Sequence, residues 1–170
     1  YSFAPMPPKI MNNIAKVTKP ALATSGTNGE LKLGEKIKTS DLLYPLLLES
    51  SNDAADVLAE YFGRDSFIAK MNQEAEKLKM SSTSYEDPSG LSAKNQSTVS
   101  DIFRLIGYLN QQRQELLKIT TKRSYSNKKH VWSSNNQFLH EIGYIGGKSG
   151  YTDIAKQSVV SLFSIPLSES

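Results

Sequence analysis

The sequence contains no cysteine in its 170 residues. This absence excludes a disulfide framework, a zinc–thiolate site and a thiol nucleophile. Histidine is also scarce, since only His130 and His140 are present, and a histidine-based metal site would need carboxylates to complete its ligand set. We therefore expect no bound metal, and any covalent chemistry must use serine, threonine, lysine or a carboxylate.

Two further absences concern charge and long apolar segments. The formal net charge is only +3, a balance that does not argue for a nucleic-acid partner and that suits work near an anionic cell surface. No apolar run approaches the roughly 20 residues of a membrane span, and no signal peptide is visible. We expect a soluble chain or the trimmed part of an exported protein, with membrane association only through segments outside it.

The hydrophobic pattern predicts an α+β fold with helices in the middle of the chain and strands at its ends. A chain of this length supports a single core, with a helical lobe at about residues 39–140 packed on a sheet whose strands come from both termini. The predicted strands are 14–18 and 158–165, the latter buried on both faces. The predicted helices are 39–48 (capped by Thr39 and kinked at Pro45), 53–62, 66–79, one from 97 or 98, and 115–121. Residues 122–129 form a basic, solvated connector.

A short polar turn, Ser50-Ser51-Asn52, joins two of the predicted helices. A Ser-x-Asn sequence places a hydroxyl and a carboxamide on one side of such a turn. There the hydroxyl can relay a proton and the carboxamide can hold a substrate amide. The alternative is that Asn52 or Asp53 only caps the following helix, because Asn and Asp are strongly preferred at that position.

A second polar stretch, Lys148-Ser149-Gly150-Tyr151-Thr152, precedes the last predicted strand. A cation, a hydroxyl and a glycine in consecutive strand positions place hydrogen-bond donors and bare backbone beside a groove, which suits a carboxylate ligand. Gly150 fits this interpretation because a glycine within a strand often marks the close approach of a ligand. The alternative is a solvent-exposed lysine in a glycine-rich turn.

Three ordered segments together resemble a known family: Leu43–Ala55 (LYPLLLESSNDAA), Asp87–Leu91 (DPSGL) and Gly147–Asp153 (GKSGYTD). They closely resemble the serine-type D-alanyl-D-alanine carboxypeptidases, which belong with the penicillin-binding proteins and serine beta-lactamases. The resemblance runs from about residue 17 to about residue 164. It implies a beta-lactamase/transpeptidase-like fold, with a helical lobe packed on an antiparallel sheet and the active site between them. Residues 1–170 would then be a single, partial domain with an incomplete sheet.

The resemblance also implies catalytic roles. Ser50 would pass a proton toward the leaving amine, Asn52 would contact the peptide of the substrate, and Lys148 would be the cation at the site. The reaction would be acylation of a serine by the penultimate D-Ala with loss of the last D-Ala, followed by hydrolysis. No metal or cofactor would take part.

Substrate-binding roles follow from the same resemblance. Ser149 would contact the terminal carboxylate of the D-Ala-D-Ala peptide beside Gly150, and the N–H of Tyr151 would donate to the oxyanion. The substrate would be the peptidoglycan pentapeptide, with beta-lactam antibiotics as covalent inhibitors. The protein would work outside the cytoplasm, in the bacterial cell envelope.

One motif of the family is not found. Its nucleophile is the serine of a Ser-x-x-Lys motif upstream of Ser50, where the lysine one turn later accepts the proton. The upstream serines Ser2, Ser25 and Ser40 have no lysine three residues later. The literal match Ser126 to Lys129 lies downstream in the basic connector, without the helical context that the motif needs.

Two explanations fit this gap. Either a segment near residues 1–14 is missing through truncation, cleavage or a gap, or the protein is a relative without the nucleophile. We favour a chain clipped at both ends, because residues from Val17 onward look ordinary for the family and the chain ends soon after one strand. The function hypotheses are therefore a D-Ala-D-Ala carboxypeptidase, an inactive peptidoglycan-binding relative, and a serine beta-lactamase that would need a water-activating base such as Glu86 or Asp87.

Overall fold

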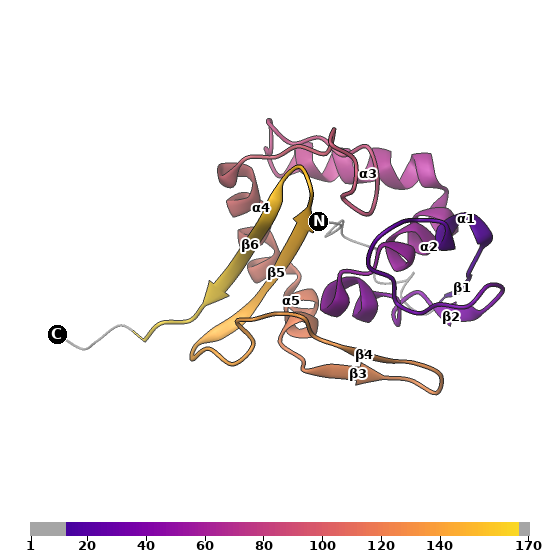
Figure 1. The fold of residues 1–170 in the computed structure, drawn as a ribbon. Helices are drawn as coiled ribbons and strands as arrows, with labels where there is room; N and C mark the ends of the chain where they lie inside the picture. Colours follow the sequence, from indigo (N-terminus) through magenta and orange to yellow (C-terminus); the bar gives the residue numbers. More distant parts are fainter. Residues whose placement is uncertain (1–12, 167–170) are drawn as a thin grey trace.

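The computed structural model describes residues 13–166, which contain both helices and strands (Figure 1). The helices are α1 (Lys19–Leu22), the π-helix η2 (Pro45–Glu49), α2 (Asn52–Phe62), α3 (Arg64–Lys77), α4 (Val99–Gln112) and α5 (Gln114–Thr120). The strands are β1 (Ile14–Lys16), β2 (Lys36–Lys38), β3 (Ser124–Ser126), β4 (Val131–Ser133), β5 (Tyr144–Thr152) and β6 (Lys156–Phe163). Helices α2 to α5 lie close to the ranges that the hydrophobic spacing predicts.

The described strands form two-stranded antiparallel sheets, β1 with β2, β3 with β4 and β5 with β6. The prediction of one sheet built from both termini is therefore wrong for residues 13–166. The β1–β2 sheet buries one residue from each strand, Ala15 opposite Ile37. This sheet packs against α2. Its inward side chains thus find their partners in the helical part of the fold rather than in the C-terminal strands.

The segment before Ser50 differs from the predicted helix over 39–48. Residues 39–42 form turns, and a π-helix begins at Pro45. The N-cap residue of this helix is Tyr44, so the prediction of Thr39 as the cap is wrong. Proline has no backbone N–H, and the regular α-helical bond from position 45 therefore cannot form. At the other end of η2, the N–H groups of Ser50 and Ser51 both donate to the carbonyl of Pro45, which makes the turn wider than that of an α-helix.

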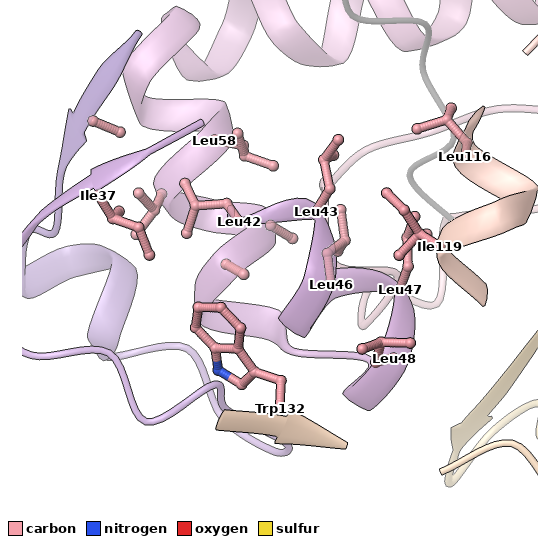
Figure 2. Close-up of a cluster of buried hydrophobic side chains, with 14 of the residues drawn as sticks. Ile37, Leu42, Leu43, Leu46, Leu47, Leu48, Leu58, Leu116, Ile119 and Trp132 are labelled. Carbon is pink, nitrogen blue, oxygen red and sulfur yellow. The ribbon is translucent and has the colours of Figure 1, made fainter. Parts of the chain in front are cut away.

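The main core lies around η2 and its neighbours (Figure 2). Its labelled members come from β2, the η2 segment, α2, α5 and β4: Ile37, Leu42, Leu43, Leu46, Leu47, Leu48, Leu58, Leu116, Ile119 and Trp132. Trp132 is fully buried, and its indole N–H donates to the carbonyl of Gly29 at 2.9 Å. Burial of each large apolar side chain stabilises the fold by about 1.5–3 kcal/mol, so this cluster fixes the segment that leads into Ser50.

The C-terminal hairpin is less buried than predicted. Val159 is 49% exposed and Phe163 is 40% exposed, so burial of this strand on both faces is wrong. The physical reason is that, within residues 13–166, β6 pairs only with β5, and no second layer of helices or strands covers its outer face. The basic connector also differs from the prediction, because residues 124–126 form a strand of the β3–β4 hairpin.

Candidate active site

Ser50 occupies an unusual backbone conformation at the end of η2. Its φ is 65° and its ψ is 35°, in the left-handed region, and its N–H donates to the carbonyl of Pro45. This conformation is uncommon for residues other than glycine, and contacts from the surroundings are needed to favour it. The turn therefore aims the Ser50 side chain in a direction that a continued helix would not allow.

Ser51 caps helix α2. Its hydroxyl accepts a hydrogen bond from the N–H of Ala54 at 3.1 Å, and its backbone is extended. The alternative in which Asn52 or Asp53 is the cap is therefore wrong, and the carboxamide and carboxylate that follow make other contacts.

Asn52 is held by the loop that precedes β2. Its Nδ2 donates to the carbonyl of Ser25 at 2.9 Å, and its backbone N–H donates to the carbonyl of Thr27 at 2.8 Å. Gly26 makes this approach feasible, because a Cβ atom there would lie 2.8 Å from Asn52 Nδ2. We call residues 25–29 the glycine-rich loop, and its contact with Asn52 has no signal in the sequence pattern.

Asp53 lies directly behind this turn and is only 2% exposed. Its Oδ1 accepts hydrogen bonds from the N–H of Gly29 at 2.9 Å, from the N–H of Ala54 at 2.8 Å, and from the hydroxyl of Ser51. Its Oδ2 is buried and has no partner among the described residues. Asp53 thus ties the glycine-rich loop to the start of α2, a role that the sequence pattern alone did not indicate.

Lys148 reaches the Ser50 turn from strand β5. It is 8% exposed, and its Nζ donates to Ser50 Oγ at 2.5 Å and to the carbonyl of Ser149. Burial lowers the pKa of Lys148 from 10.5 to about 8, because removal from water disfavours the charged amine. The alternative of an exposed lysine in a turn is therefore wrong, and an amine with this pKa exchanges protons readily near neutral pH.

Two glycines place β5 so that Lys148 can reach Ser50. A Cβ at Gly146 would lie 3.0 Å from Leu117 Cβ of α5, and a Cβ at Gly147 would lie 2.3 Å from the carbonyl oxygen of Val160 in β6. The N–H of Gly147 also donates to Thr120 Oγ1 of α5 at 3.1 Å. The bare backbone therefore lets β5 pack against α5 and β6 at once.

The remaining predicted site residues follow Lys148 on β5. Ser149 and Gly150 are half-buried, whereas Tyr151 is 65% exposed and its hydroxyl donates to Asp153 at 3.2 Å. In the register of the hairpin, Gly150 lies opposite Ser158. The structure thus brings Lys148 to Ser50 by a direct hydrogen bond and places the other three residues on the same strand.

The other candidates from the sequence are engaged in structural contacts. Asp87 accepts hydrogen bonds from the backbone N–H groups of Ser89, Gly90 and Ser92 within its own loop. Glu86 is exposed and pairs with Lys94 at 3.0 Å. Neither carboxylate is therefore arranged as a poised base in this structure.

The literal Ser-x-x-Lys match does not form a catalytic pair. Ser126 is exposed on the β3–β4 hairpin, and Lys129 Nζ lies 3.5 Å from Glu35 Oε1. His130 Nε2 contacts the same carboxylate at 2.9 Å. Within residues 13–166 there is no group of three or more potential metal ligands and no helix long and apolar enough to cross a membrane. The region near residues 1–14, where we expect a segment to be missing, lies almost entirely outside the described residues.

Known proteins match this chain over most of its length. The profile of peptidase family S11, described as D-alanyl-D-alanine carboxypeptidase, matches residues 9–165. The D-alanyl-D-alanine endopeptidase of Haemophilus influenzae is 35% identical over 140 residues, which make up 74% of this chain and 48% of that protein. This chain therefore spans about half of the length of that relative.

Solved structures match the fold. The D-alanyl-D-alanine carboxypeptidase of Mycobacterium tuberculosis has a TM-score of 0.84 and 29% identity, over 91% of this chain and 62% of that chain. The Streptomyces K15 DD-transpeptidase has a TM-score of 0.84 and 24% identity, over 91% of this chain and 68% of that chain. These matches confirm both the transpeptidase-like α+β fold and the predicted resemblance. The chain belongs to the D-alanyl-D-alanine carboxypeptidase family, peptidase family S11.

Proposed function

We propose that the protein is a serine-type D-Ala-D-Ala carboxypeptidase that acts on the stem peptides of peptidoglycan and binds beta-lactams covalently. Residues 1–170 would form part of one penicillin-binding domain, with the helical lobe at about residues 39–140, and the protein would work outside the cytoplasm in the cell envelope. The observation that carries the proposal is the hydrogen bond from the buried Lys148 amine to Ser50 Oγ at 2.5 Å, across 98 sequence positions.

The proposed reaction proceeds through an acyl-enzyme. A serine hydroxyl attacks the carbonyl carbon of the penultimate D-Ala, and the bond to the nitrogen of the terminal D-Ala breaks. Ser50 passes a proton to that nitrogen, and Lys148 supports the transfer because its lowered pKa lets it give and take a proton at neutral pH. Water then hydrolyses the ester and restores the serine.

Substrate binding uses the strand that carries Lys148. Ser149 contacts the terminal carboxylate, Gly150 lets the peptide approach the backbone, and the N–H of Tyr151 donates to the oxyanion, a fixed dipole worth about 3–4 kcal/mol in such sites. Asn52 holds the peptide of the substrate through its carboxamide, whose orientation is fixed by the hydrogen bond from Nδ2 to the carbonyl of Ser25.

Residues 13–166 contain no Ser-x-x-Lys pair in the helical context of the family motif, so the proposal concerns the full-length protein. The experiment is to incubate the intact, folded, full-length protein with a labelled penicillin and to measure its mass. We expect a stable covalent adduct of one drug molecule on each protein molecule, together with release of D-Ala from a D-Ala-D-Ala peptide. Absence of an adduct would contradict an acyl-enzyme and favour the peptidoglycan-binding relative, and rapid turnover of the drug would point to a beta-lactamase.

A further inference from the structure

The segment that follows β4 contacts the backbone immediately before Ser50. The backbone N–H of Asn135 donates to the carbonyl of Leu48 at 3.1 Å, and its Nδ2 donates to the carbonyl of Glu49 at 3.1 Å. The N–H of Ser133 donates to Glu49 Oε1 at 2.9 Å. The last carbonyls of a helix lack hydrogen-bond donors within the helix. Here Asn135, which is 86 positions away from Glu49 in the sequence, supplies the donors.

These contacts fix the peptide unit between Glu49 and Ser50 at both of its ends. The carbonyl of Glu49 accepts from Asn135, and the N–H of Ser50 donates to the carbonyl of Pro45. The φ angle of Ser50 measures the rotation of its own atoms relative to this peptide plane. A plane held at both ends therefore stabilises the left-handed φ of 65° that Ser50 adopts.

The segment that carries Asn135, residues 134–136, is held by further hydrogen bonds. The N–H of Ser134 donates to the carbonyl of Arg123 at 2.8 Å, and Asn136 Oδ1 accepts from the N–H of Phe138 at 2.9 Å. Asn136 Nδ2 also donates to the hydroxyl of Tyr144, the first residue of β5. Residues 134–136 therefore contact both the end of η2 and the start of β5, the strand that carries Lys148.

We propose that Asn135 is a positioning residue for Ser50. Its carboxamide holds the Glu49–Ser50 peptide plane, so that Ser50 stays in its left-handed conformation with its hydroxyl against the Lys148 amine. The effect of Asn135 on catalysis rests on the function proposed above, whereas its effect on the Ser50 to Lys148 contact does not. Asn135 is exposed, so its side chain can be changed without opening the core, and its backbone bond to Leu48 remains in every variant.

The first test follows the Lys148 amine by ¹⁵N NMR titration and needs no activity. Loss of the Ser50 hydroxyl in Ser50→Ala removes an acceptor of the charged amine, so the pKa of Lys148 should fall below its wild-type value of about 8. Asn135→Ala should lower the same pKa by at least half as much. In the double variant Ser50→Ala with Asn135→Ala, the second change should add nothing, because Asn135 acts through Ser50.

The matched variants separate positioning from general stability. Asn135→Asp keeps the size of the side chain but cannot donate to Glu49, and it should behave as Asn135→Ala does. Gln137→Ala, an exposed polar residue in the same segment, should leave the Lys148 titration unchanged. An unchanged Lys148 pKa in Asn135→Ala, or an equal shift with and without the Ser50 hydroxyl, would overturn the proposal.

The second test measures penicillin acylation of the full-length protein. Asn135→Ala and Asn135→Asp should each lower the acylation rate constant at least tenfold with little change in the preceding binding step, and Gln137→Ala should acylate as the wild type does. Wild-type acylation rates in both Asn135 variants would overturn the positioning role. Absence of acylation in the wild type would count against the proposed function alone, since the Lys148 titration decides the role of Asn135 independently.

Discussion

At the scale of single residues, the main feature of the candidate site is a buried lysine whose hydrogen-bond partners are neutral oxygens. Within residues 13–166, Lys148 Nζ donates to a hydroxyl and to a backbone carbonyl and forms no salt bridge with a carboxylate. Burial therefore acts on its pKa without an opposing charge, and the direction of the shift is downward. The residue that we propose for the site thus reduces the stability of the fold whenever it is charged.

The pH dependence of stability tests this conclusion. Between about pH 8 and 10.5 the unfolded state keeps the Lys148 proton while the folded state has released it. The unfolded state binds more protons there, so the free energy of unfolding should rise with pH, by at most about 3 kcal/mol. Lys148→Met removes the titrating group, so the difference between wild type and variant in urea unfolding should move in favour of the wild type across this window. Parallel pH profiles would show that Lys148 titrates normally when folded.

Asp53 makes a second prediction at the residue scale. Asp53→Ala leaves the N–H of Gly29 and the hydroxyl of Ser51 buried without their acceptor and should cost about 2–4 kcal/mol in urea unfolding. Asp53→Asn keeps one acceptor oxygen and removes a buried charge, so it should cost less than half as much. Asp65→Ala, in the exposed first turn of α3, should change stability by less than about 0.5 kcal/mol. Equal losses for both Asp53 variants would contradict the acceptor role.

Strand β5 combines close packing with the polar residues of the candidate site. Its first half is adapted for close approach, with Gly146 against α5 and Gly147 against β6. Its second half carries the polar residues, so the packing of the glycines sets where Lys148 and Ser149 lie. Helix η2 does the same on the other side, because its π-helical turn begins at Pro45 and ends at Ser50, whose N–H donates to the carbonyl of Pro45.

A pair of glycine variants tests the packing of β5. In Gly147→Ala the new methyl group would meet the carbonyl oxygen of Val160 at 2.3 Å, and a paired strand backbone cannot step aside as a side chain can. We expect a loss of at least about 2 kcal/mol in the free energy of unfolding. Gly107→Ala in α4 meets nothing within 4 Å and should stabilise the protein by about 0.5–1 kcal/mol. A neutral Gly147→Ala would show that the hairpin is less tightly packed than described.

At the scale of the whole molecule, the site forms where segments distant in sequence meet. Helices α2 to α5 were predictable because their apolar spacing is regular. The pairing of Ser50 with Lys148 was predictable because the residue types in the two motifs are unusual in combination. The sheet pairing was not, because β1 and β2 bury only Ala15 and Ile37, too few residues to show a period. The contacts of Asn135 with the end of η2 were also not predictable from the sequence. An exposed asparagine in an irregular segment has no sequence pattern, and these contacts form only when the chain folds.

We propose that the Ser50 turn and strand β5 form one site for the terminal carboxylate of a D-Ala-D-Ala peptide, and a direct binding measurement tests this proposal. Titration of the protein with an N-acetylated D-Ala-D-Ala peptide, followed by NMR or calorimetry, should show affinity that falls at least tenfold in Lys148→Ala, about 1.4 kcal/mol or more. Lys156→Ala, at the exposed tip of the same hairpin, should bind as the wild type does. Unchanged affinity in Lys148→Ala would contradict the account and place the peptide elsewhere.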